Sequence, residues 1–158
     1  MKRHRIVLVA VALGALVLSG AAFGASAHSS GATVVTTKKM SFGTILVTSS
    51  GQTLYLDTAD KPGHPACTGG CLSVWPPLKA NGKPKAAGSA KSSLLGTTKI
   101  ARGVVQVTYN GHQLYTFASD TKSNPTSGEG ISDFYVVNPN GTKITSTTTK
   151  KPSKNPGY

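Results

Sequence analysis

The sequence has few acidic and few aromatic residues, and both shortages narrow what the protein can do. Among 158 residues there are five Asp and Glu against 17 Lys and Arg, and aromatic residues make up 6%. So few carboxylates leave little for the paired acid and base of a glycosidase-type site. The histidines beyond the N-terminal segment, His28, His64 and His112, lie in no recognisable catalytic motif. We therefore expect no enzymatic activity and no cofactor.

Long hydrophobic runs are also missing, and the one run near the N-terminus is typical of a leader. Lys2, Arg3 and Arg5 precede an apolar run over 6–18, and Ala25-Ser26-Ala27 is a cleavage signal. The run is shorter than the roughly 18 residues of a membrane-spanning helix. We expect a signal peptide over 1–27, export by the general secretory route and no transmembrane segment afterwards. No Cys stands at the cleavage site, so no lipid anchor is expected.

The remaining chain is strongly basic, but its cations are dispersed lysines. Three of the 17 cations lie in the leader, and the other 14 against five acids give a net charge of +9. Arg102 is the only Arg among them, whereas specific nucleic-acid readers rely on Arg forks and basic clusters. The charge is either a means of solubility or an attraction to an anionic cell-envelope polymer or membrane surface.

Two segments of the chain repeat each other at an offset of sixty residues. Residues 45–60 align without a gap with residues 105–120. The identical pairs are Val47/Val107, Thr48/Thr108, Gly51/Gly111, Leu54/Leu114, Tyr55/Tyr115 and Asp60/Asp120. A duplicated unit of this length predicts two equivalent structural repeats.

Each copy reads as a β-hairpin. Asn110-Gly111 is a strong signal for a two-residue turn, and Ser50-Gly51 is a weaker one at the same place. Such turns put aliphatic pairs on the core-facing side and Tyr55 and Tyr115 on the opposite side. The predicted cross-strand pairs are Val47–Leu54, Ile45–Leu56, Val107–Leu114 and Val105–Thr116.

The whole pattern predicts a mainly β fold with little helix. We expect a single small domain over 28–144, with repeat one at about 43–80 and repeat two at about 103–141. Each repeat should hold about four strands. The expected single elements are further strands at 34–39, around 99–100, at 134–137 and at 143–147, a helical turn over 71–75, and a disordered basic tail over 145–158.

Each copy contains a tyrosine followed after four residues by an aspartate. Together with the segments 67–78 (CTGGCLSVWPPL) and 93–96 (SLLG), this resembles the bacterial secreted-repeat family of predicted lipoproteins with a Y-x4-D motif. The family often has an aromatic residue two positions after the tyrosine. Phe117 fits that pattern, while Asp57 departs from it. The resemblance implies export and a repeated unit but no activity, because the family's biochemical function is not established.

The motif has a structural and a functional interpretation. The aspartates could accept backbone N–H groups and fix turns, while the tyrosines occupy a half-buried face. Alternatively, the tyrosine rings form surface platforms for a ligand, with the aspartates as hydrogen-bond acceptors. The candidate ligand-binding residues are Tyr55, Asp57, Asp60, Tyr115, Phe117 and Asp120.

The two cysteines form an even pair in an exported chain, which favours a disulfide between Cys67 and Cys71. On a helical turn their Cα atoms could lie about 6 Å apart, within disulfide range. With His64 they could instead bind zinc or copper. We expect a monomeric extracellular or cell-envelope protein, most simply a non-enzymatic binding or envelope-associated module. The alternative is a metal- or redox-linked envelope protein that uses these three residues.

Overall fold

The structure is a computed structural model that describes residues 31–145. The predicted leader, and the predicted tail beyond Thr145, lie outside this range. No helix among the described residues is long and apolar enough to span a bilayer. The elements are β1 (Val34–Met40), β2 (Gly43–Thr48), β3 (Tyr55–Asp57), α1 (Cys71–Val74), β4 (Lys85–Ala86), β5 (Leu95–Lys99), β6 (Val105–Tyr109), β7 (His112–Gln113) and β8 (Phe134–Val136), with single 3-10 turns at Ser92–Leu94 and Ala101–Gly103. The fold is mainly β, as predicted.

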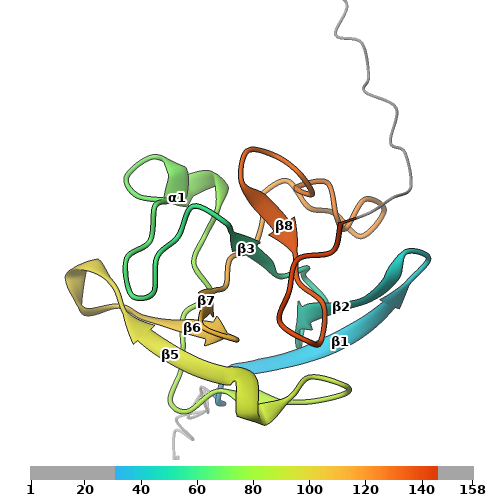
Figure 1. The fold of residues 1–158 in the computed structure, drawn as a ribbon, viewed down its shortest axis with the longest axis horizontal. Coiled ribbons are helices and arrows are strands. Elements are labelled where there is room, and N and C mark those ends of the chain that lie inside the picture. Colours follow the sequence, from blue (N-terminus) through green and yellow to red (C-terminus); the bar gives the residue numbers. More distant parts are fainter. Residues whose placement is uncertain (1–30, 146–158) are drawn as a thin grey trace, which may run out of the picture.

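Each repeat begins with an antiparallel hairpin, β1–β2 in the first copy and β5–β6 in the second (Figure 1). Alternating β-branched residues favour these strands, because one face of each packs on the core. The predicted strand at 34–39 is present as β1. The strand expected around 99–100 is β5, which begins earlier, at Leu95. Of the late strand predicted at 143–147, the structure shows a single bridge between Val137 and Lys143.

At the centre of the fold, four short antiparallel segments alternate between the two copies. Tyr55 and Tyr115 exchange two backbone N–H···O hydrogen bonds, each 2.9 Å long. On its other side Tyr55 pairs with Val136 of β8, and Tyr115 pairs with Pro77. Figure 1 shows β3 and β8 side by side in the middle of the molecule. Each copy therefore completes the central sheet of the other.

The turn between the paired segments differs in length between the copies. In the second copy the predicted two-residue turn is present: Tyr109 pairs with His112 around Asn110 and Gly111, which have φ of 50° and 81°. In the first copy the predicted two-residue turn is wrong. The Thr48 N–H donates to the Gln52 carbonyl over 2.8 Å, which leaves a three-residue loop over 49–51.

The longer loop shifts the predicted pairing in the first copy by one residue. Val47 pairs with Thr53 instead of Leu54. The predicted pair Val107–Leu114 is confirmed by a 3.0 Å hydrogen bond from the Leu114 N–H to the Val107 carbonyl. The other two predicted pairs are wrong: Leu56 pairs with Tyr135 of β8, and the Thr116 N–H donates to the Pro76 carbonyl over 3.0 Å.

The extra loop residue also changes which positions of the two copies are structurally equivalent. Ile45 pairs with Lys38, and Gln106 pairs with Thr98. The equivalent residues Leu54 and Leu114 donate their N–H groups to the carbonyls of Leu46 and Val107, which lie sixty-one residues apart. Their preceding neighbours Ile45 and Gln106 therefore occupy equivalent positions. The identical residues Val47 and Val107 therefore do not correspond in space. Beyond the turn the offset returns to sixty, which aligns Tyr55 with Tyr115.

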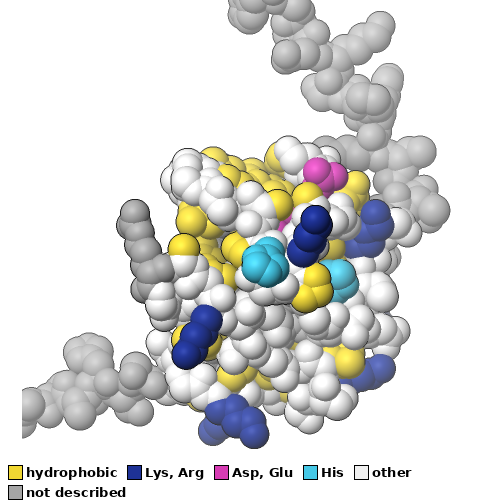
Figure 2. Space-filling model, turned by 60° about the vertical axis from the view of Figure 1, so that its left-hand side comes forward, with side chains coloured by type: hydrophobic (Ala, Val, Ile, Leu, Met, Phe, Trp, Pro, Cys, Tyr) yellow, Lys and Arg dark blue, Asp and Glu magenta, His cyan; other side chains and the backbone are white. Residues whose placement is uncertain are grey.

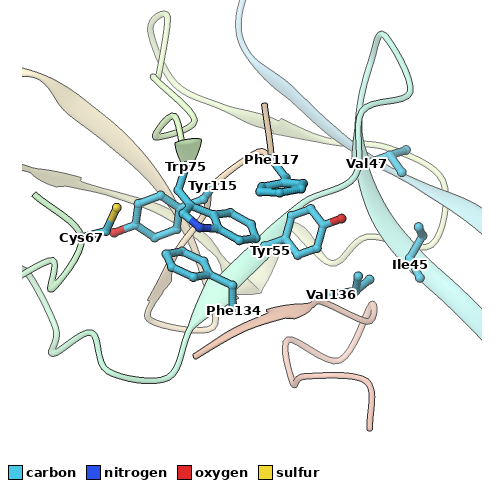
Figure 3. Close-up of a cluster of buried hydrophobic side chains, with 9 residues drawn as sticks. All are labelled: Ile45, Val47, Tyr55, Cys67, Trp75, Tyr115, Phe117, Phe134 and Val136. Carbon is cyan, nitrogen blue, oxygen red and sulfur yellow. The ribbon is translucent and has the colours of Figure 1, made fainter. Parts of the chain in front are cut away.

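The central sheet is buried on both faces, whereas the sequence predicted only one core-facing side and a half-buried opposite side. The aliphatic face packs in a cluster of Val35, Leu46, Leu54, Leu56, Val107, Tyr109, Leu114 and Val137. The other face packs in the cluster drawn in Figure 3, made of Ile45, Val47, Tyr55, Cys67, Trp75, Tyr115, Phe117, Phe134 and Val136. Tyr55 and Tyr115 are both 0% exposed. The tyrosines were expected to point away from the core, but the aromatic residues form a second core over them.

The alternation of segments predicts that neither repeat folds alone. A fragment of residues 28–90 lacks β8, and a fragment of residues 91–158 lacks the partner segment around Pro77. Each would leave a buried strand edge unpaired, which is costly. We expect both fragments to show unfolded amide NMR spectra, and an equimolar mixture to recover the dispersed spectrum of the whole protein. A dispersed spectrum from either fragment alone would contradict the interlocked arrangement.

Candidate functional site

The tyrosines and aspartates of the two Y-x4-D motifs form crossed pairs. The Tyr55 hydroxyl donates to Asp120 Oδ2 over 2.8 Å, and the Tyr115 hydroxyl donates to Asp60 Oδ2 over 2.9 Å. Figure 3 shows the two hydroxyls pointing to opposite ends of the aromatic cluster. The tyrosine of each motif therefore binds the aspartate of the other motif.

The second oxygen of each aspartate holds the loop that follows it. Asp60 Oδ1 accepts the Ala66 N–H over 2.7 Å. Asp120 Oδ1 accepts both the Ser127 N–H, over 2.9 Å, and the Ser127 hydroxyl, over 2.8 Å. Each carboxylate thus joins a loop of its own repeat to the buried tyrosine of the other repeat. These contacts give the motif a structural role.

Burial determines the protonation of this network. Burial, followed by the hydrogen bond to a carboxylate, raises the pKa of the Tyr55 and Tyr115 hydroxyls far above the ordinary 10.0, so both stay neutral donors. Burial also raises the pKa of Asp60 above 3.8, although the Ala66 N–H and the Tyr115 hydroxyl act in the opposite direction. The two hydroxyls are therefore fixed as hydrogen-bond donors to the carboxylates.

The exposed tyrosine platforms of the alternative, functional interpretation are not present. Both tyrosine rings lie inside the core, and their hydroxyls are engaged by Asp60 and Asp120. Phe117 lies in the same core with its ring centre 4.4 Å from that of Trp75. The structure thus brings the tyrosines and Phe117 together around Trp75, away from solvent. A ligand role for the six predicted residues stays a prediction. Burial of both tyrosines and Phe117 keeps their rings from contact with a ligand at the surface.

Asp57 occupies the position that Phe117 has in the second copy, but it has a different local role. Its side chain is buried, and its Oδ1 accepts the Ala59 N–H over 2.9 Å. Burial and, to a lesser degree, the charge of Asp133 raise the pKa of Asp57. The first copy therefore fixes its turn with a carboxylate where the second copy adds an aromatic ring to the core.

The predicted disulfide between Cys67 and Cys71 is present, with the Cα atoms 5.4 Å apart. It closes the loop that leads into α1, which begins at Cys71. The bond engages both sulfurs, so the thiolates of the alternative metal site with His64 are not available. Among residues 31–145, no group of three or more His, Cys, Asp or Glu side chains is arranged to hold a metal ion.

The half-buried Glu129 and the fully buried Gln106 are two polar residues that the sequence prediction did not include. The Glu129 carboxylate accepts the Val136 N–H over 2.6 Å at the edge of β8, and burial raises the pKa of Glu129. Gln106 is 0% exposed in β6. The polar residue between Val105 and Val107 was a signal for Gln106, but the predicted register placed it opposite Tyr115 on the half-buried face, away from the core.

The fold is a duplicated β unit in which each copy pairs its central strands and its tyrosine–aspartate hydrogen bonds with the other copy. The sequence profile of a family described as a secreted repeat of unknown function matches residues 33–79 and 96–137, more than half of the chain. The chain belongs to this family. The two matched segments begin before the predicted repeats because they include β1 and part of β5. No curated protein and no solved structure matches the chain.

The crossed geometry predicts which side chains are energetically coupled. Tyr55→Phe and Asp120→Ala each remove the same hydrogen bond, so their double-mutant cycle should show a coupling of about 1–2 kcal/mol in the free energy of unfolding. The cycle of Tyr55→Phe with Asp60→Ala, within one motif, should show almost none. Urea denaturation measures both. Tyr135→Phe, outside the core pairs, is the control for loss of a hydroxyl. Coupling within the motif and not across it would contradict the structure.

The raised pKa of Asp57 predicts a pH-dependent cost of its charge. Because the folded state holds this proton more tightly than the unfolded chain, the free energy of unfolding falls as pH rises from about 3.8 through the folded-state pKa. Asp57→Asn removes this loss and keeps an oxygen for the Ala59 N–H. We expect the variant to gain stability relative to the natural protein between pH 3.5 and pH 7, measured by urea denaturation. A difference that does not change with pH would contradict the assignment.

Proposed function

We propose that this exported protein is a non-enzymatic, envelope-associated binding protein, and that its partner is an anionic cell-envelope polymer. The proposal depends on how the fold distributes its charges between interior and surface. A surface of one sign attracts a polymer of the opposite sign over distances of about a Debye length.

The fold engages most of its acidic side chains in internal hydrogen bonds, with Asp57 buried and Asp60, Asp120 and Glu129 half-buried. Four of the five acidic residues accept hydrogen bonds from buried or loop groups inside the fold: Asp57, Asp60, Asp120 and Glu129. The fifth, Asp133, is exposed. The carboxylates therefore do little to neutralise neighbouring surface lysines.

The positive charge, in contrast, lies at the surface. All ten described lysines are exposed: Lys38, Lys39, Lys61, Lys79, Lys83, Lys85, Lys91, Lys99, Lys122 and Lys143. Figure 2 shows several basic side chains spread over one face, with little acidic surface between them. Dispersed ammonium groups act as point charges, which suits a partner with repeated anionic groups better than a single bidentate anion. This arrangement favours polymer binding over recognition of one small ligand by charge.

The proposal includes that the protein has no enzymatic activity. The tyrosine and aspartate side chains that the two motifs share are engaged with one another and with loop N–H groups. A group that must take part in a reaction has to reach a substrate. In this network both hydroxyls are engaged by aspartates at the ends of the aromatic cluster, which supports a role in holding the fold.

Retention on purified cell-wall polymer tests the proposal. We expect binding at 20 mM salt that falls steeply by 300 mM, because surface charge is screened. Replacing Lys38, Lys83, Lys85 and Lys122 together by Gln should weaken binding about tenfold, at a few tenths of a kcal/mol for each charge. The same four positions changed to Arg keep the charge and form the matched control.

Two outcomes would overturn the proposal. Retention that is equal in the Gln and Arg variants would show that the surface charge does not drive binding. Binding to vesicles rich in anionic phospholipid, without retention on the polymer, would assign the basic surface to a membrane instead.

A further inference from the structure

An apolar cavity of 570 Å³ opens between the two copies, beside the disulfide. Its walls include Cys67, Leu72 and Pro76 from the first copy and Ile100 and Val104 from the second. The volume lies within the range of small-molecule sites, roughly 300–1,000 Å³. Figure 2 brings the side of α1 and the β5–β6 turn forward and shows hydrophobic side chains gathered there. The cavity is thus an apolar hollow on a basic surface.

Gln106 lines this cavity and carries an unpaired polar atom. Its side chain is fully buried, and its Nε2 donates to the Leu114 carbonyl over 2.9 Å. Its Oε1 is the one buried side-chain nitrogen or oxygen among the described residues that has no hydrogen-bond partner. Buried acceptors are rarely left unpaired in folded proteins, so this atom needs an explanation.

The fold itself does not require a polar residue at this position. The structurally equivalent residue of the first copy is Ile45, which is also fully buried. Ile45 lies in a hydrophobic cluster against which Met40, Phe42 and Ile144 pack. The first copy therefore closes this region with hydrocarbon, whereas the second copy keeps a cavity lined by Gln106, whose amide oxygen has no partner.

The polar groups of the cavity wall also restrict what could bind. Gln106 Nε2 already donates to a carbonyl, and the hydroxyl of Tyr115, which lines the cavity too, already donates to Asp60. On these two side chains a ligand carbonyl would find only the second N–H of Gln106 as a donor. A ligand hydroxyl would find a free acceptor in Gln106 Oε1. A charged ligand would lose its hydration against the apolar walls, whose one charged side chain, Lys79, is exposed to solvent.

We propose that this cavity binds a small uncharged alcohol or phenol, with its hydrocarbon or aromatic body against the apolar walls and its hydroxyl donating to Gln106 Oε1. This site goes beyond the proposed polymer binding and does not depend on it. The polymer would contact exposed lysines, whereas this ligand would contact buried residues.

A matched pair of probes tests the proposal on the mature full-length protein. 4-Propylphenol has the donor hydroxyl, and 4-propylanisole replaces its proton by a methyl group. We expect saturable amide NMR shifts at cavity residues with the phenol, and at least tenfold weaker binding of the ether. In Gln106→Ile, which adopts the residue of the first copy, the preference for the phenol should disappear while the spectrum stays that of a folded protein.

A second variant separates the cavity from the amide oxygen. Val104→Phe fills the cavity, so it should weaken both probes at least tenfold, while Ile131→Ala at an exposed hydrophobic residue elsewhere should change neither. Polymer retention of Val104→Phe should equal that of the natural protein, so this proposal and the polymer proposal can fail separately. Equal affinities of the natural protein for the two probes, or shifts that never saturate, would overturn the site. These two measurements use the natural protein, so they test the site even if Gln106→Ile does not fold.

Discussion

The antiparallel pairing of Tyr55 with Tyr115 is the contact on which the rest of the fold depends. Two backbone hydrogen bonds place these residues at the centre of a sheet whose segments alternate between the copies. The same pairing directs the hydroxyls to opposite ends, where each meets the aspartate of the other copy. Trp75, stacked on Phe134 at 3.8 Å, then covers the tyrosine face of the sheet. The tyrosine and aspartate of each motif therefore make their hydrogen bond with the other repeat and not with each other.

The two copies share one plan but differ where one residue is added to a turn. The three-residue loop of the first copy places Ile45 where the second copy has Gln106. Beyond the turn, Asp57 stands where the second copy has Phe117, and only the first copy has the disulfide. The two copies therefore share a core but differ locally: the first has the disulfide and a buried Ile45, and the second has Gln106 beside a cavity.

Much of the local structure could be predicted from the sequence, but the relation between the copies could not. The strand at 34–39, the turn at Asn110, the helical turn at Cys71 and the disulfide follow from β-branched residues, turn chemistry and cysteine spacing. The exchange of strands leaves no local pattern, because each segment reads as a strand whichever copy it pairs with. Burial of the tyrosines was missed for the same reason: a second covering layer comes from residues far along the chain.

Alternation of the central segments also determines when the chain can fold. β3 near residue 55 pairs with β8 near residue 135, and Pro77 pairs with Tyr115, so the central contacts join residues far apart in sequence. Contacts of such separation form late and slow folding. A chain that emerges from its N-terminus must have released almost the whole domain before the first central strand gains both neighbours. A chain that crosses a membrane in this direction therefore cannot complete its central sheet until its second copy has crossed, although the local hairpin β1–β2 needs only the first copy.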